Sequence, residues 1–167
     1  MKKILMIVGV LAFPTASNPT DNSKLSLGIG YGFSNDGVIS LHGDFDISKA
    51  ANNAPVKARI GYDHYARNYG WGPANNYSWS YNVLYGGAYY DFNKELKLDR
   101  KLHPFIGLGM GFGSASCSGN WCNSVSNPTV GGLYFIGGVQ YNLTPKIDAE
   151  VNLNAWGGLT LGVNFNL

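Results

Sequence analysis

The sequence has few charged residues and no helical pattern. Charged residues make up 13% of its 167 positions, about half of the roughly 25% that is usual for soluble domains. Two of its 12 Lys and Arg lie at positions 2 and 3, directly before the N-terminal apolar run, so beyond that run ten remain against 10 Asp and Glu. This neutrality gives no reason to expect nucleic acid as a partner. Beyond residue 17 no stretch has apolar residues at helical spacing, which argues against an α-helical domain.

Long hydrophobic runs are also absent. The apolar run from Ile4 to Phe13 is ten residues long, whereas a membrane-spanning helix needs about 20. Two lysines precede the run, and a proline and small residues follow it, which is typical of a secretory signal peptide. We expect residues 1–17 to be a signal peptide that is cleaved after Ser17, with cleavage one residue earlier as the alternative. Residues 18–167 then form a single domain.

Cysteine is scarce. Cys117 and Cys122 lie five positions apart in "CSGNWC". Because an exported chain reaches an oxidising compartment, we expect these two residues to close a small disulfide loop; two unpaired thiols are the alternative. A cysteine pair without a histidine cluster does not indicate a metal site. No metal and no cofactor are expected.

Apolar residues recur at every second position through the rest of the chain. In "LSLGIGYGF" the odd-numbered positions 25 to 33 are apolar, while Ser26 and glycines occupy the other face. The same alternation appears in "IDAEVNLNA" and in "LTLGVNFNL", which is the pattern of half-buried strands. The alternation predicts an all-β chain with eight strands, at residues 25–33, 39–47, 56–66, 79–92, 105–113, 132–143, 147–155 and 159–167.

Turn residues suggest how neighbouring strands pair. A hairpin about "NDG" sets Leu27 beside Phe45, a second hairpin sets Asp44 beside Arg59, and a turn at "WGG" sets Ile147 beside the last residue. Strand four, "YNVLYGGAYYDF", is apolar on both sides, so its facing is ambiguous. By analogy with "YFIGGVQYNL", we assign one face to its even-numbered positions: Leu84, Ala88, Tyr90 and Phe92.

Alternation alone does not decide which face meets water. A soluble calycin-like barrel buries its apolar face, and a membrane barrel turns that face to lipid. The polar faces of three strands carry seven glycines, which would neither strengthen nor shield a solvent-facing surface but which leave room inside a narrow barrel. Aromatic residues lie toward strand ends, as at membrane interfaces. We therefore predict an antiparallel up-and-down transmembrane β-barrel, with a soluble secreted ligand-binding barrel as the alternative.

These features resemble a known family. An export signal, eight alternating strands, the segments "GGAYYDF" and "HPFIGLGMGFG", and the end "LTLGVNFNL" are similar to the small bacterial outer-membrane barrels, the OmpA/OmpX-like domains. The resemblance implies a monomer in the bacterial outer membrane with outer-membrane lipid as its surroundings. Leu167 departs from the aromatic residue that usually ends chains of this family.

By strand parity, the inner face collects charged side chains that must be paired when they are buried. We interpret them as an ion-pair network that plugs the barrel; a proton path or a ligand site is the alternative. The expected members are His42, Asp44, Asp46, Lys57, Arg59, Asp63, Asp148 and Glu150.

Two long loops are expected on the cell surface, at residues 67–78 and 114–129. Tyr, Trp, Asn, Ser and Gly dominate both, a mixture found in binding loops and also in ordinary exposed loops. We expect them to contact a host surface, a glycan or a protein. Their aromatic candidates are Tyr69, Trp71, Tyr77 and Trp121.

Catalysis is not expected. Some barrels of this size modify lipid A, which would need a histidine and a serine on the lipid-facing side near the outer rim. Only His64 is suitably placed, and it has no His-x-Ser neighbour. We interpret His64 as a girdle or loop residue, and a lipid-modifying enzyme is the least favoured alternative.

Overall fold

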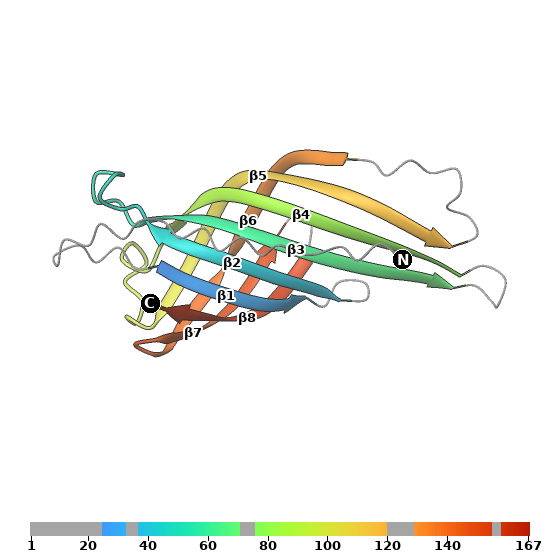
Figure 1. Cartoon of the computed structure of the whole chain (residues 1–167). Helices are drawn as coiled ribbons and strands as arrows, with labels where there is room; N and C mark the ends of the chain where they lie inside the picture. Colours follow the sequence, from blue (N-terminus) through green and yellow to red (C-terminus); the bar gives the residue numbers. More distant parts are fainter. Residues whose placement is uncertain (1–24, 33–36, 71–75, 120–128, 155–157) are drawn as a thin grey trace.

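The protein folds into a closed barrel of eight antiparallel strands. The computed structural model describes residues 25–32, 37–70, 76–119, 129–154 and 158–167. Every strand pairs with its neighbours in sequence, and β1 pairs with β8 to close the barrel (Figure 1). The strands are β1 (Leu25–Gly32), β2 (Val38–Asp46), β3 (Val56–Gly70), β4 (Asn76–Asp91), β5 (Leu102–Gly119), β6 (Thr129–Thr144), β7 (Ile147–Asn154) and β8 (Gly158–Asn166). Within these ranges no helix is long and apolar enough to cross a membrane.

The register of the strands fixes the tilt of the barrel. Followed from Ile29 through β2, β3 and β4, the paired residues reach Phe112 on β5. Followed the other way, through β8, β7 and β6, they reach Leu102. The offset is 112 minus 102, or ten residues, and for eight strands it corresponds to a tilt of about 43°.

The predicted register is correct for one hairpin and wrong for two. Asp44 lies opposite Arg59 as predicted. In the first hairpin, however, Phe45 pairs with Leu25 rather than Leu27, and in the last hairpin Ile147 pairs with Phe165. Each of these two pairings is shifted by two residues: the β1–β2 ladder ends at Gly32 and Val38, and the β7–β8 ladder ends at Asn154 and Gly158. A shift of two residues keeps every side chain on its predicted face.

Apolar side chains cover the outer surface at the level where all eight strands are present. On β5, Ile106, Leu108, Met110 and Phe112 all point outward and are more than half exposed. From Leu102 to Phe112 there are ten residue steps of about 3.3 Å, which a tilt near 43° converts to a height of about 24 Å. This is close to the apolar band of about 25 Å on membrane barrels.

Strand four faces as assigned. Leu84 and Ala88 are exposed on the outer surface, and Val83, Tyr85 and Tyr89 are buried inside. Tyr85 and Tyr89 belong to an interior cluster that also contains Phe105, Tyr134 and Ile136. The even-numbered assignment for this strand is therefore confirmed.

Four neighbouring strands are much longer than the others. β3, β4, β5 and β6 extend beyond the ends of β1, β2, β7 and β8 on one side (Figure 1). We call this extension the wall: residues 66–70, 76–82, 113–119 and 129–135. The long loops predicted at 67–78 and 114–129 are thus too long, because the β3–β4 ladder continues to Gly70 and the β4–β5 ladder to Gly119. Tyr69 and Tyr77 are paired strand residues rather than loop residues.

On β4 and β5 the outer surface of the wall is polar. Above Phe112, the outward positions of β5 are Ser114, Ser116 and Ser118. Two of these serines bond to serines of β4, with Oγ–Oγ distances of 2.6 Å for Ser80 and Ser116 and 2.7 Å between residues 78 and 118. The change from apolar to hydroxyl side chains along one face of one strand marks the upper edge of the apolar band.

Candidate functional site

Arg59 lies at the centre of the barrel interior. Its side chain, 2% exposed, extends from β3 toward β7. The guanidinium donates through Nε to Asp44 Oδ1 at 2.6 Å and through Nη2 to Asp44 Oδ2 at 2.7 Å. It also donates through Nη1 and Nη2 to the two oxygens of Glu150, at 2.8 and 2.7 Å. One arginine therefore joins two carboxylates from different strands, each in the bidentate geometry that gives the strongest ion pairs.

Glu150 is fully supplied with donors. Besides Arg59, its oxygens accept from Gln140 Nε2 at 2.8 Å, from Asn152 Nδ2 at 2.6 Å and from Asn164 Nδ2 at 2.7 Å. Asp44 accepts a further bond of 2.8 Å from the Tyr89 hydroxyl. Buried carboxylates are stable when every lone pair has a donor, and Glu150 meets this condition.

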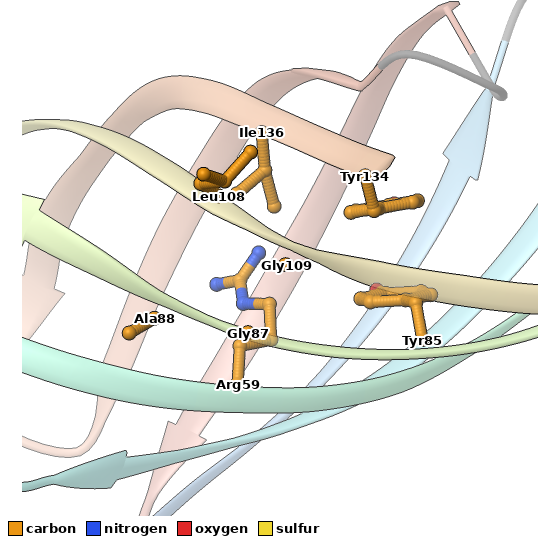
Figure 2. Close-up of a pocket in the computed structure, with 8 residues that line it drawn as sticks. All are labelled: Arg59, Tyr85, Gly87, Ala88, Leu108, Gly109, Tyr134 and Ile136. Atoms are coloured by element: carbon orange, nitrogen blue, oxygen red, sulfur yellow. The ribbon is translucent and has the colours of Figure 1, made fainter. Parts of the chain in front are cut away.

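Aromatic rings enclose the guanidinium. Arg59 Cζ lies 5.1 Å from the centre of the Tyr89 ring and 5.4 Å from that of Phe105, within the range of cation–π attraction. Figure 2 shows the adjoining cavity, beside the stacked rings of Tyr85 and Tyr134, whose centres are 4.2 Å apart. Its volume is about 10 Å³, roughly the space for one water molecule. The cavity is too small for an organic ligand.

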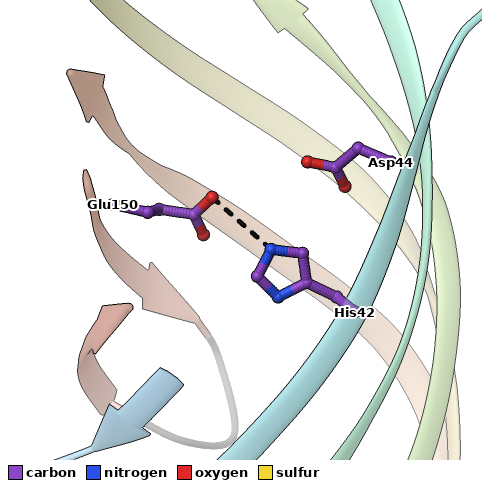
Figure 3. Close-up of side chains that lie close together, drawn as sticks. All are labelled: His42, Asp44 and Glu150. Carbon is purple, nitrogen blue, oxygen red and sulfur yellow. Dashed lines mark ion pairs between the residues drawn. The ribbon is translucent and has the colours of Figure 1, made fainter. Parts of the chain in front are cut away.

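His42, Asp44 and Glu150 offer ligand atoms within 4.8 Å of one another (Figure 3). The group nevertheless does not fit a metal ion, because Arg59 brings its own positive charge to both carboxylates. His42 Nε2 is 3.6 Å from Glu150 and 2.9 Å from Asn164 Oδ1. Since that amide oxygen only accepts, Nε2 carries the proton and is not a free metal ligand.

Arg59, Asp44 and Glu150, with the side chains that hydrogen-bond to them, form the Arg59 cluster. Asp63 and Asp148 lie inside the barrel but outside this cluster. Asp63 Oδ2 accepts from Tyr65 at 3.0 Å and from Tyr134 at 3.2 Å. Asp148 Oδ2 accepts from Asn166 at 2.9 Å. The second oxygen of each carboxylate is buried and has no hydrogen-bond partner.

The remaining two members of the predicted network are placed differently. Asp46 and Lys57 face each other in the register, but among the described residues no ion pair joins them. Asp46 instead accepts from the backbone and the hydroxyl of Ser48, at 2.8 and 2.5 Å, and so caps the β2–β3 turn. Lys57 lies with its Nζ 5.9 Å from the Tyr89 ring centre. Both side chains are only half-buried, where water can replace a direct pair.

The sequence reasoning missed the neutral members of the cluster. Tyr89, Gln140, Asn152 and Asn164 all contact Asp44 or Glu150. Strand parity could have identified these four residues, because each of them lies at an inward position of its strand. The predicted network includes only the charged or ionisable residues of that face.

His64 lies on the outer surface, near the upper edge of the apolar band. Its Nδ1 is 2.9 Å from Asn82 Oδ1, which also accepts from the Tyr62 hydroxyl at 2.6 Å. The partner of His64 is thus an amide, which supplies no carboxylate for a catalytic triad. In the part of the chain that the structure describes, no serine hydroxyl bonds to His64.

Of the other predicted site residues, only one more has a described position. Cys117 lies on β5, opposite Trp79 of β4. Cys122, Trp71 and Trp121 are outside the described residues, as is the expected signal peptide, so the disulfide and the loop contacts stay predictions.

The fold defines a class of protein: a closed, eight-stranded, antiparallel barrel with an apolar outer band and a polar interior. Comparison with solved structures gives the same class. The N-terminal β-barrel domain of Pseudomonas aeruginosa OprF matches with a TM-score of 0.62 at 15% identity, covering 87% of this chain and 98% of that one. The chain thus has the fold of the small bacterial outer-membrane barrels, as its sequence resemblance implied.

Two further solved structures show the same likeness. The attachment invasion locus protein Ail of Yersinia pestis, in complex with the heparin analogue sucrose octasulfate, matches with a TM-score of 0.60 at 15% identity, covering 87% of this chain and 99% of that one. Neisserial surface protein A matches with a TM-score of 0.54 at 18% identity, covering 86% and 95%. No protein-family model and no curated protein matches the sequence.

Proposed function

We propose that the chain is an integral protein of the bacterial outer membrane, with a plugged interior and with the wall on the cell surface. The observation that carries the proposal is the reversed arrangement of its side chains. Leucine, isoleucine and phenylalanine cover the outside, while Arg59, Asp44 and Glu150 are buried in the centre. A soluble ligand-binding barrel has the opposite arrangement.

Two features support a plugged interior and a structural role. The Arg59 cluster crosses the barrel from β2 and β3 to β7, and aromatic rings pack against it on the β4 and β5 side. The adjoining cavity has room for about one water molecule. This cavity does not provide the continuous chain of waters that a water-mediated proton path would need.

An arginine on the outer apolar band tests the membrane placement. Leu108, 51% exposed, lies in the middle of the band. Leu108→Arg should destabilise a lipid-embedded barrel by about 2–4 kcal/mol, whereas it would be nearly neutral on a soluble surface. Urea titration in lipid vesicles, followed by heat-modifiable gel migration, measures the difference.

The matched control is Ser116→Arg, on the same outward face of the same strand but on the wall. It should leave the unfolding midpoint unchanged. Equal midpoints for the two variants would overturn the membrane placement.

The proposed second role is surface recognition by the wall. Two aromatic side chains, Trp79 and Tyr81, lie on the face of β4 that turns inward over the barrel mouth, with ring centres 6.0 Å apart. Within the wall, β3 is no longer paired with β2, and β6 is no longer paired with β7, among the described residues. Each of these two strands therefore has one unpaired edge, and such edges accept an added strand. Aromatic rings and free backbone groups are suited to binding a protein or a glycan.

The charge of the wall restricts the partner. Ail is described in complex with a polysulfated heparin analogue. In this chain residues 66–82 contain one cation, Arg67, and residues 113–135 contain none. We therefore propose an uncharged glycan or a protein rather than a polyanion.

Adhesion of whole cells tests this role. Trp79→Ala combined with Tyr81→Ala should lower adhesion to host cells at least about tenfold, because aromatic side chains dominate such contacts. Ser78→Ala combined with Ser80→Ala, on the opposite face of the same strand, is the control and should not change adhesion. Added heparin should not compete. Equal adhesion of all three strains would exclude recognition by this face.

We propose no enzymatic activity. Lipid A modification would require His64 to work with an acid and a nucleophile, and its partner is Asn82. A change of lipid A structure in cells on His64→Ala would contradict this part of the proposal.

A further inference from the structure

The two ends of the barrel differ in charge. At the end where β1 begins and β8 finishes, the connections 47–55, 92–101 and 145–146 contain six Lys and Arg against Glu95 and Asp99, a net charge of four. The connections at the opposite end, residues 33–37, 71–75, 120–128 and 155–157, contain a single charged residue, Asp36. Four of the six cations belong to one connection, the β4–β5 turn (residues 92–101).

The β4–β5 turn has a defined backbone. Leu96 N donates to Phe92 O at 3.0 Å, and Leu98 N donates to Asn93 O at 3.2 Å. The Asn93 amide closes the turn by donating to the carbonyls of Asp99 and Leu102, at 2.7 and 2.6 Å. The side chains of the turn are therefore presented from a fixed frame rather than from a loose loop.

Both acids of the turn are held by other groups. Glu95 Oε1 accepts from the Tyr90 hydroxyl at 2.5 Å, and Asp99 Oδ1 accepts from Lys101 N at 2.9 Å. The four cations, in contrast, are exposed, and in the described part of the chain none of them forms an ion pair. They are Lys94, Lys97, Arg100 and Lys101.

An exposed leucine lies between these cations. Leu96 is 57% exposed and hydrogen-bonds to Phe92, whose ring packs on that of Tyr90 with centres 4.9 Å apart. Tyr90 and Phe92 are outward-facing aromatics at the lower edge of the apolar band, the position of a membrane-interface girdle. Leu96 is thus exposed next to this aromatic pair, in the same turn as the four cations.

We propose that the β4–β5 turn binds the headgroups of anionic phospholipids in the adjacent leaflet. Exposed lysine and arginine side chains beside a bilayer attract anionic lipid, and an apolar side chain among them adds insertion. A cell-wall polymer would also be attracted by the cations, but it offers no reason for an exposed leucine beside the aromatic girdle. The inference rests on the proposed membrane placement.

The test is the selectivity of the reconstituted full chain for phosphatidylglycerol over phosphatidylcholine, measured by electron spin resonance with spin-labelled lipids. Two double variants remove two charges each from the same end of the barrel: Lys97→Gln with Arg100→Gln, and the control Lys49→Gln with Lys146→Gln. We expect the turn variant to lower the selectivity about three- to tenfold and the control to retain it.

The other outcomes are equally decisive. No preference for phosphatidylglycerol in the parent chain, or an equal loss in both variants, would overturn the assignment to this turn. Retention on peptidoglycan sacculi that depends on Lys97 and Arg100, without lipid selectivity, would identify a cell-wall polymer instead. Heat-modifiable migration of every sample separates a failure of membrane insertion, which would contradict the proposed function, from a failure of lipid binding alone.

Discussion

Replacing Arg59 with methionine is expected to destabilise the barrel by about 3–5 kcal/mol, because the change leaves two buried carboxylates without their cation. Methionine retains much of the side-chain volume, so the loss reports the charge rather than a cavity. Asp44 would keep the Tyr89 hydroxyl, and Glu150 would keep only neutral amide donors. Urea unfolding in detergent micelles, followed by heat-modifiable migration, gives the free energy.

Two further variants show whether the effect is electrostatic. Lys57→Met removes a cation from the same strand and face, but Lys57 is half-buried and makes no ion pair among the described residues, so less than about 1 kcal/mol is expected. Arg59→Met combined with Asp44→Asn and Glu150→Gln removes the whole charged group and should recover most of the loss. A triple variant no more stable than Arg59→Met alone would show that shape, not charge, sets the cost.

The sequence predicts this cluster only in part. Alternation assigns Arg59, Asp44 and Glu150 to one face, and the turn between β2 and β3 brings the first two together. The contact between Arg59 and Glu150 spans 91 positions. It depends on how far the strands are staggered when the barrel closes, and strand periodicity does not contain that quantity.

The strand ends were less predictable than the faces. Tyr, Ser and Asn in residues 67–78 are typical of a loop, yet aromatic and hydroxyl residues also suit an exposed strand pair. These residues do form a strand pair, with Arg67 opposite Trp79 and Gly70 opposite Asn76. Similarly, the turn chemistry of "NDG" predicts a hairpin in which Phe45 lies opposite Leu27, whereas Phe45 pairs with Leu25. Local composition does not reveal how far two strands remain paired.

A large effect on barrel closure is also expected from Gly87. A Cβ at Gly87 would lie 2.5 Å from the Leu108 carbonyl oxygen and 2.6 Å from Gly109 Cα, both backbone atoms of β5. Gly87→Val should therefore force the two strands apart beside the Arg59 cluster, at a cost of about 3 kcal/mol. The fraction of folded barrel recovered in lipid vesicles, read from heat-modifiable migration, measures the loss.

Gly86 provides the matched control for this effect, because it is the preceding residue of the same strand and points to the outer surface. The nearest atoms to a Cβ there are 3.9 Å away, which is ordinary contact. Gly86→Val makes the same change of backbone freedom and strand propensity, so any difference from Gly87→Val measures the space inside the barrel. Equal folding of the two variants would mean that the interior can expand at β4 and β5. That result would also contradict the proposal of a plugged interior, because the proposal depends on close packing around Arg59.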